Sequence, residues 1–193
     1  NVSGVRDIYK VGGAQAIAAM AYGTQTIPKI HKVLGPCSPF GAAAKEMVGG
    51  VINPGMPAGP SDAIILCDES ADPDNTVLDV LNEAEHGPDS AGLLVTHDEK
   101  LARYVHAKLK EEIAGLPEPQ KSYLMTNMAA YSGVILTDNL ESSIAFANLY
   151  APEHIVLKTK NNDDVLSKLQ NVAEILIGEN SPSSLGNYGI GVN

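Results

Sequence analysis

Short apolar runs alternate with helix-length segments between residues 63 and 177, and this alternation limits the folds open to the chain. The runs are Ala63–Cys67, Gly92–Thr96, Gly133–Thr137, Ile155–Lys158 and Glu174–Ile177. Continuous apolar runs are typical of strands buried on both faces of a parallel sheet. Parallel strands need crossover connections, and helices fit the segments between the runs. The pattern therefore predicts an α/β fold, an incomplete Rossmann-like, mostly parallel sheet with helices on both faces.

The remaining segments predict the helices and a domain boundary. The expected helices are Gly13–Tyr22, Ser38–Val48, Asp72–His86, Asp98–Gly115, Leu140–Tyr150 and Asp163–Ala173. The loop Asn53–Pro60 is rich in glycine and proline and is the expected crossing between two domains. Ligand-binding groups of open parallel sheets collect at the carboxyl ends of the strands, so we expect the candidate site at that edge.

Charge and cysteine content exclude several classes of partner. A net charge of −10 argues against a nucleic-acid partner and against anionic membranes. The sequence has no apolar run long enough to span a bilayer. Cys37 and Cys67 do not make a disulfide framework for a chain of this length, so we expect a reducing, cytoplasmic environment.

Glu83 and His86 form the first candidate site. They lie three residues apart near the end of an expected helix and therefore share one face. A Glu-x-x-His pair can ligate one metal ion. The alternative is a solvated glutamate beside a histidine that interacts with the helix dipole, which explains the spacing without a metal.

Glu153 and His154 form the second candidate site. They lie between an expected helix and an expected strand. Histidine is suited to moving protons near neutral pH, and glutamate can activate water. Neighbouring residues at a strand start point in different directions, so two separate roles are easier to assign than one shared role. A chance pairing of an acid with a histidine is the alternative.

Two loops contain small residues that permit close backbone approach. The run Gly12-Gly13-Ala14-Gln15-Ala16 resembles a nucleotide loop but lacks the complete G-x-G-x-x-G pattern. Close packing of a helix on a sheet explains it equally well. The run Met56–Ser61 would hold a rigid loop that presents Ser61, or it would serve as a turn between domains.

Taken in order, these motifs resemble the histidinol dehydrogenase family. The matching stretches are VGGAQAIAA (Val11–Ala19), MPAGPS (Met56–Ser61), AEHGPDS (Ala84–Ser90), APEH (Ala151–His154) and the SLGNY run that follows. The resemblance spans nearly the whole chain. It implies an aldehyde-dehydrogenase-like architecture, in which residues 1–60 are part of an NAD-binding Rossmann-like domain. Residues 61–193 would then be a second Rossmann-like domain that carries the catalytic and zinc-site residues.

The resemblance implies a zinc-dependent oxidation of L-histidinol to L-histidine through the aldehyde, with NAD as the oxidant. By resemblance, His154 is the general base, and Glu153 activates the water that attacks the aldehyde. The implied NAD contacts are Gln15 and Ser38, the implied substrate contacts are Ser61, Glu83, His86 and His154, and the implied zinc ligands are Glu83, His86 and Asn187.

The chain departs from the family pattern at three of these positions. The usual Gly-Pro-Gly-Asn is Gly35-Pro36-Cys37-Ser38, the usual zinc-binding Gln is Glu83, and the usual zinc-binding Asp is Asn187. The last two changes are reciprocal, so the ligand set keeps one amide, one carboxylate and a formal charge of −1. We infer that zinc binding is retained while the substrate side of the metal is rearranged.

The rearrangement leaves two alternatives to histidinol oxidation. One is a dehydrogenase of the same family that acts on another small polyol, such as a sulfopropanediol. The other is an inactive nucleotide-binding or assembly fragment. The chain starts at Asn1 and stops at Asn193 after a glycine-rich run, so we expect a central piece without the family's N- and C-terminal parts. The family forms domain-swapped homodimers, and we expect a homodimer of the full-length protein.

Overall fold

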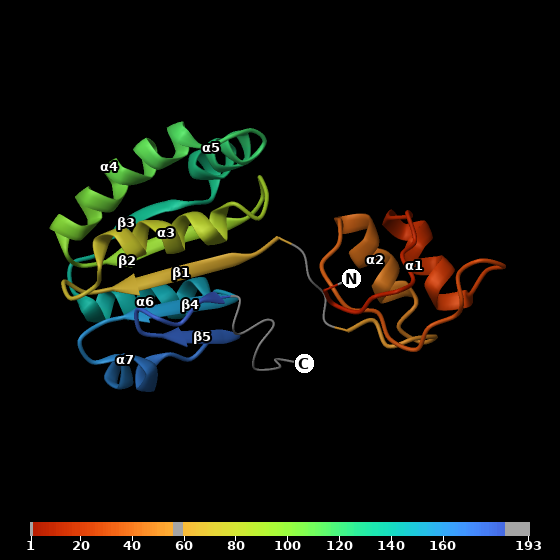
Figure 1. The fold of residues 1–193 in the computed structure, drawn as a ribbon. Coiled ribbons are helices and arrows are strands. Elements are labelled where there is room, and N and C mark those ends of the chain that lie inside the picture. Colours follow the sequence, from red (N-terminus) through yellow and green to blue (C-terminus); the bar gives the residue numbers. More distant parts are fainter. Residues whose placement is uncertain (1, 56–59, 184–193) are drawn as a thin grey trace. The chain divides into compact units, whose positions relative to one another are not determined.

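The computed structural model of the protein describes residues 2–55 and 60–183 (Figure 1). These residues fall into two compact units, which divide between residues 59 and 60. Among the described residues, no helix is long and apolar enough to cross a membrane.

The first unit contains two helices, α1 (Gly13–Tyr22) and α2 (Pro39–Met47). Its small core consists of Ile17, Ala21, Val48 and Ile52. α2 begins at a proline, whose fixed φ suits a first helical position, and the hydroxyl of Ser38 caps it by accepting a hydrogen bond from the Gly41 amide at 3.4 Å. Both helices lie where the sequence predicts them.

The second unit is a five-stranded sheet with the strand order β3-β2-β1-β4-β5. All of its strand pairs are parallel, which confirms the predicted fold class. The strands are β1 (Asp62–Cys67), β2 (Ala91–Thr96), β3 (Gly133–Leu136), β4 (His154–Lys158) and β5 (Glu174–Ile177). The helices are α3 (Pro73–Ala84), α4 (Glu99–Gly115), α5 (Gln120–Ala130), α6 (Leu140–Tyr150) and α7 (Asn162–Lys168).

Helices cover both faces of this sheet. On one face, Ile65, Leu94 and Val156 pack against Val80 of α3 and Val105 of α4. On the other face, strand residues that include Ile64 and Ile155 pack against α6 and α7. Burial on both faces explains why the central strands are uninterrupted apolar runs.

Gly92 allows α3 to approach β2 closely. A Cβ at this position would lie 2.4 Å from the backbone oxygen of Val80, which is too short for any side chain. The absence of a side chain at Gly92 therefore sets how near α3 lies to the strands, and α3 carries two of the candidate site residues.

The structure differs from the sequence prediction in two elements. Helix α5 was not predicted, because its apolar residues do not recur at helical spacing and only Leu124 and Asn127 are buried. Helix α7 ends at Lys168 rather than at the predicted Ala173. The side chain of Asn148 on α6 binds the Lys168 carbonyl and the Gln170 amide, and these bonds hold the chain in an extended form after the helix.

Candidate functional site

The candidate residues of the second unit lie at the edge of the sheet where the strands begin, which we call the amino edge. Ser61 precedes β1, Glu153 precedes β4, and His154 is the first residue of β4. α3 follows β1 and packs alongside the parallel strands β1 and β2, so it runs against the strand direction and its last turn brings Glu83 back to this edge. The prediction that these residues lie at the carboxyl edge is therefore wrong.

Three of the candidate residues, Ser61, Glu83 and His154, also share one face of the sheet. Strand side chains alternate between faces, and His154 has the same parity as Val156 and Lys158, which contact α3. Ser61 contacts Glu83 of α3 directly. Within the described residues no hydrogen bond or ion pair joins His86 to His154, so the structure brings the two histidines to the same edge without a direct contact.

Glu83 is a buried carboxylate that three side chains orient. It is 2% exposed. Its Oε1 accepts hydrogen bonds from Ser183 at 2.6 Å and from the amide of Asn82 at 3.0 Å. Its Oε2 accepts from Ser61 at 3.3 Å. Hydroxyl and amide donors replace the water that the carboxylate loses on burial, and they fix its direction.

His86 presents one ring nitrogen that is free to bind a metal. Its Nδ1 lies 3.0 Å from the carbonyl oxygen of Asn82 and 3.2 Å from that of Glu83. Carbonyl oxygens only accept, so Nδ1 carries the proton and the lone pair of the neutral ring is on Nε2. A backbone carbonyl in this position is the usual outer partner of a metal-binding histidine. The donor chemistry of Glu83 and His86 therefore fits a zinc ion.

Asn127 supports the turn that carries these two residues, and no sequence motif marks it. Its side chain is fully buried on α5. Its amide donates to the carbonyl of Ala84 and, at 3.2 Å, to that of Gly87. Carbonyls at the end of a helix lack partners within the helix. Asn127 supplies donors for the end of α3, between Glu83 and the Gly87-Pro88 break.

A buried ion cluster fixes the segment after β5 against α3. Lys158 Nζ lies 2.6 Å from Asp79 Oδ2 and 2.9 Å from Glu179 Oε2. Burial raises the pKa of Asp79 despite this ion pair, with smaller contributions from Glu179 and Glu83. Burial opposes the charge of Lys158, but hydrogen bonds to both carboxylates outweigh it and raise the lysine's pKa. Asp79 therefore holds its proton more tightly because it is partly buried, and Lys158 does so because two carboxylates face it. The cluster anchors the segment that leads to Ser183.

His154 lies between two carboxylates. Its Nε2 is 3.6 Å from Glu153 Oε1, and its Nδ1 is 2.6 Å from Glu174 Oε2. The His154 side chain is 9% exposed, whereas that of Glu153 is 49% exposed. The Glu153 amide donates to Asp62 Oδ1 at 2.7 Å, which fixes the backbone before the histidine. The buried imidazole of His154 is therefore suited to act as a base, and the exposed carboxylate of Glu153 is suited to contact water. Glu174 was not among the predicted site residues, although an acid at the start of an apolar strand is unusual.

The other predicted contacts belong to the first unit or to residues outside the described ranges. Gln15, on α1, and Ser38, before α2, are exposed residues of the first unit. Asn187 and the residues 56–59 of the MPAGPS run lie outside the described residues. Among residues 2–55 and 60–183, no group of three His, Cys, Asp or Glu side chains is arranged to hold a metal ion. The described part therefore contributes two of the three predicted zinc ligands, Glu83 and His86.

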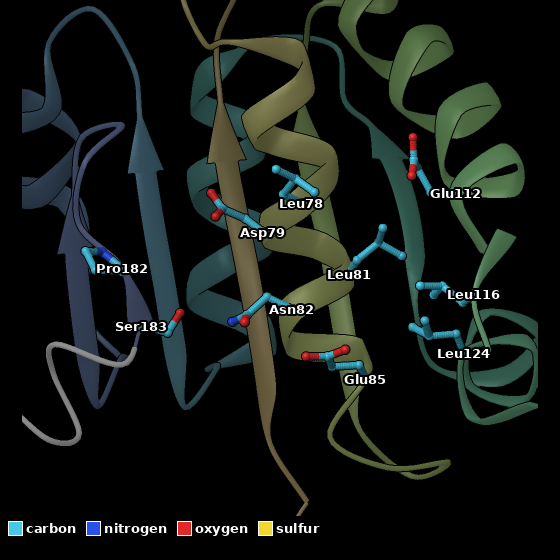
Figure 2. Close-up of a pocket in the computed structure, with 10 residues that line it drawn as sticks. All are labelled: Leu78, Asp79, Leu81, Asn82, Glu85, Glu112, Leu116, Leu124, Pro182 and Ser183. Atoms are coloured by element: carbon cyan, nitrogen blue, oxygen red, sulfur yellow. The ribbon is translucent and has the colours of Figure 1, made fainter. Parts of the chain in front are cut away.

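A pocket of about 440 Å³ opens beside α3 (Figure 2). Its lining includes Asn82 and Ser183, which both donate to Glu83, and the apolar side chains of Leu81 and Leu124. His154 is not part of the lining. The pocket therefore lies next to the residues that bind Glu83 and apart from His154.

Comparison with known proteins identifies the family. A family model described as histidinol dehydrogenase matches residues 1–193. The chain belongs to the histidinol dehydrogenase family. A histidinol dehydrogenase from Synechocystis sp. is 47% identical over 192 residues, which cover 100% of this chain and 44% of the relative. A histidinol dehydrogenase homolog from Colwellia psychrerythraea is 44% identical, and the match covers 98% of this chain and 43% of the homolog. The chain thus spans less than half the length of these relatives.

Solved structures agree with this family assignment. A histidinol dehydrogenase from Elizabethkingia anophelis superposes with a TM-score of 0.83 at 37% identity, over 97% of this chain and 43% of that one. A propionaldehyde dehydrogenase from Clostridium phytofermentans superposes with a TM-score of 0.52 at 15% identity, over 91% of this chain and 52% of that one. The second likeness concerns the fold alone. Together they confirm the predicted histidinol dehydrogenase resemblance and the aldehyde-dehydrogenase-like architecture.

We predict that Asn127→Ala loosens the end of α3 in this family member. The substitution leaves the carbonyls of Ala84 and Gly87 without their donor, at a cost of about 1–3 kcal/mol in the free energy of unfolding. Hydrogen exchange followed by mass spectrometry should show faster exchange of the backbone amides of residues 85–91. Asn148→Ala is the matched control, since it removes side-chain bonds to α7 and its exit. Equal exchange at residues 85–91 in all three proteins would contradict the role of Asn127.

Proposed function

We propose that the full-length protein is a zinc-dependent, NAD-linked dehydrogenase that oxidises L-histidinol to L-histidine through the aldehyde. The observation that carries the proposal is the buried imidazole of His154 beside Glu153, on the same edge and face of the sheet as Glu83. Membership of the family and the 47% identity to a histidinol dehydrogenase support it. As the family implies, we also propose that the protein is a homodimer and works in the cytoplasm.

His154 and Glu153 divide the proton chemistry between them. In our proposal, His154 Nε2 removes the proton of the substrate hydroxyl, and again that of the hydrated aldehyde. Glu153 is exposed enough to contact water and activates the water molecule that attacks the aldehyde. Bound zinc would polarise the substrate oxygen, and NAD would accept the electrons at each oxidation.

Glu83 and His86 would hold the zinc ion, together with Asn187. The Glu83 carboxylate is already oriented by its three donors, and His86 has its free lone pair on Nε2. A carboxylate and an imidazole are strong ligands, whereas a neutral amide is a weak one. Most of the affinity contributed by this chain should therefore come from Glu83 and His86. Ser61, beside Glu83, would contact the substrate.

Gln15 and Ser38 are the proposed NAD contacts of the first unit. The Ser38 hydroxyl accepts a hydrogen bond from the Gly41 amide, and it keeps its own proton for donation to a ligand. Gln15 is exposed near the start of α1, where the small residues Gly12 and Gly13 leave the backbone accessible.

A second candidate function is the oxidation of another small polyol, such as a sulfopropanediol. The reciprocal replacement of Gln by Glu83 and of Asp by Asn187 favours it, because it moves the carboxylate to another side of the metal. The identities do not separate the two functions, since the Colwellia homolog is 44% identical and the Synechocystis enzyme 47%. The third candidate is an inactive nucleotide-binding or assembly fragment.

We predict that His154→Asn lowers kcat by about 100-fold or more, because the proton acceptor is lost.

We further predict that Glu153→Gln slows oxidation of the aldehyde more than oxidation of the alcohol, because only oxidation of the aldehyde consumes water. The measurement is NADH formation by the full-length protein with histidinol, histidinal and a panel of small polyols. His106→Asn, at an exposed position of α4, is the matched control and should keep full activity.

Each outcome of this assay decides between the candidate functions. Turnover of polyols but not of histidinol would replace the first function with the second. No turnover of any substrate by the full-length protein would favour the inactive fragment. Full activity of His154→Asn would contradict the assignment of the base.

We predict that the reciprocal ligand change is compensatory. Glu83→Gln alone should lower the zinc content of the full-length protein, because it removes the carboxylate from the ligand set. The double variant Glu83→Gln with Asn187→Asp restores one carboxylate and one amide and should recover the zinc content. Zinc is measured by mass spectrometry after dialysis against a weak chelator. Glu111→Gln, at an exposed position of α4, is the control. A double variant that binds no more zinc than Glu83→Gln would refute the compensation.

A further inference from the structure

Glu174 is a half-buried acid whose carboxylate oxygens are buried next to the imidazole of His154. It is the first residue of β5 and pairs with His154 in the strand register. Its side chain is 14% exposed, and Oε2 lies 2.6 Å from His154 Nδ1. Leu176, two residues further along β5, packs on the α3 face, so Glu174 and His154 lie on the same face as the candidate site.

The surroundings of Glu174 require a proton in this pair. Among the described residues, His154 Nδ1 and both oxygens of Glu174 are buried and have no well-directed hydrogen bond, so their 2.6 Å approach is a close ion-pair contact. A buried carboxylate without donors is costly unless a cation or a proton compensates it. Glu83 shows the contrast, since three neutral donors surround it. For Glu174 the imidazole is the nearby group that can supply the proton, and Nδ1 is the nitrogen that faces the carboxylate.

Among the described residues, the charged groups that contact His154 are acids. Glu153 approaches Nε2 from the residue before β4, and Glu174 approaches Nδ1 from β5. Asp62 lies at the start of β1 and binds the Glu153 amide, and Glu83 lies on the same face at the end of α3. The nearest lysine along β4, Lys158, is bound to Asp79 and Glu179. Glu174 is the acid nearest to the ring and the more buried of the two that contact it.

We infer that Glu174 is a positioning residue for His154, holding the ring with its proton on Nδ1 and leaving Nε2 as the atom that accepts the substrate's proton. The inference rests on the proposed role of His154 as the base. When Nε2 takes the proton, the ring becomes a cation, and the negative charge 2.6 Å from Nδ1 stabilises it. The proton then leaves from Nε2 to solvent, and Nδ1 keeps its own proton throughout.

The tautomer of His154 tests this inference independently of catalysis. Full-length protein labelled with ¹⁵N-histidine gives the tautomer of each neutral ring by NMR, and His154→Asn assigns the signal. We expect the wild-type ring to carry its proton on Nδ1. In Glu174→Gln the population with the proton on Nε2 should rise, because the carboxylate that approaches Nδ1 is lost. Glu174→Asp keeps the carboxylate and should restore most of the wild-type ratio, while Glu111→Gln should leave the ratio unchanged.

Activity supplies the second readout. In Glu174→Gln we expect kcat to fall by about 10-fold or more, with KM changed by less than about 3-fold, because the acid touches the base and not the substrate. Glu174→Asp should recover part of kcat.

The outcomes separate failure of this inference from failure of the proposed function. A wild-type ring protonated on Nε2, or a tautomer ratio that does not change in Glu174→Gln, would overturn the positioning role, and the wild-type measurement holds even if the variant does not fold. A tautomer ratio that changes while kcat stays the same would support the Glu174–His154 coupling and remove His154 as the base.

Discussion

The packing of α3 against the parallel strands determines where the candidate site lies. A helix that connects two parallel strands has to run back against them, so its last turn returns to the edge at which the strands begin. Gly92 permits the close approach, and Val77 and Val80 bury the apolar side of the helix. Glu83 follows Val80 by one turn and is therefore held against the amino edge.

Polar groups of the second unit are buried in compensated sets. At the amino edge, Glu83 has hydroxyl and amide donors and Glu174 has the imidazole of His154, whereas Lys158, at the carboxyl end of β4, has two carboxylates. Each set joins elements that are distant in sequence, such as α3 to the segment after β5. Since a buried charge is tolerated only with its partners in place, these sets tie the geometry of the site to the correct packing of the whole unit.

The sequence predicted the elements well because their signals are local. Gly13–Tyr22, Leu140–Tyr150 and Glu174–Ile177 have the predicted bounds, since apolar periodicity and turn residues mark them directly. The sequence did not predict the features that depend on tertiary contacts. The apolar residues of α5 show little helical periodicity. The role of its buried Asn127 becomes visible only in the hydrogen bond to the end of α3.

The candidate site was predicted in part for the same reason. The pairs Glu83–His86 and Glu153–His154 are adjacent in sequence and visible in it. Their edge was predicted wrongly, because the general rule for parallel sheets was applied to residues that precede strands or end a helix. Glu174 was missed because it lies far from His154 along the chain and meets it only through the pairing of β4 with β5.

The central claim is that the functional groups of this chain assemble at the amino edge, around Glu83, His86 and His154. Anomalous X-ray diffraction at the zinc edge from crystals of the full-length protein tests it most directly. The account predicts a zinc peak at about 2.0–2.2 Å from His86 Nε2 and from an oxygen of Glu83. A zinc ion bound at the carboxyl edge, with Glu83 bonded only to its serine and asparagine donors, would contradict it.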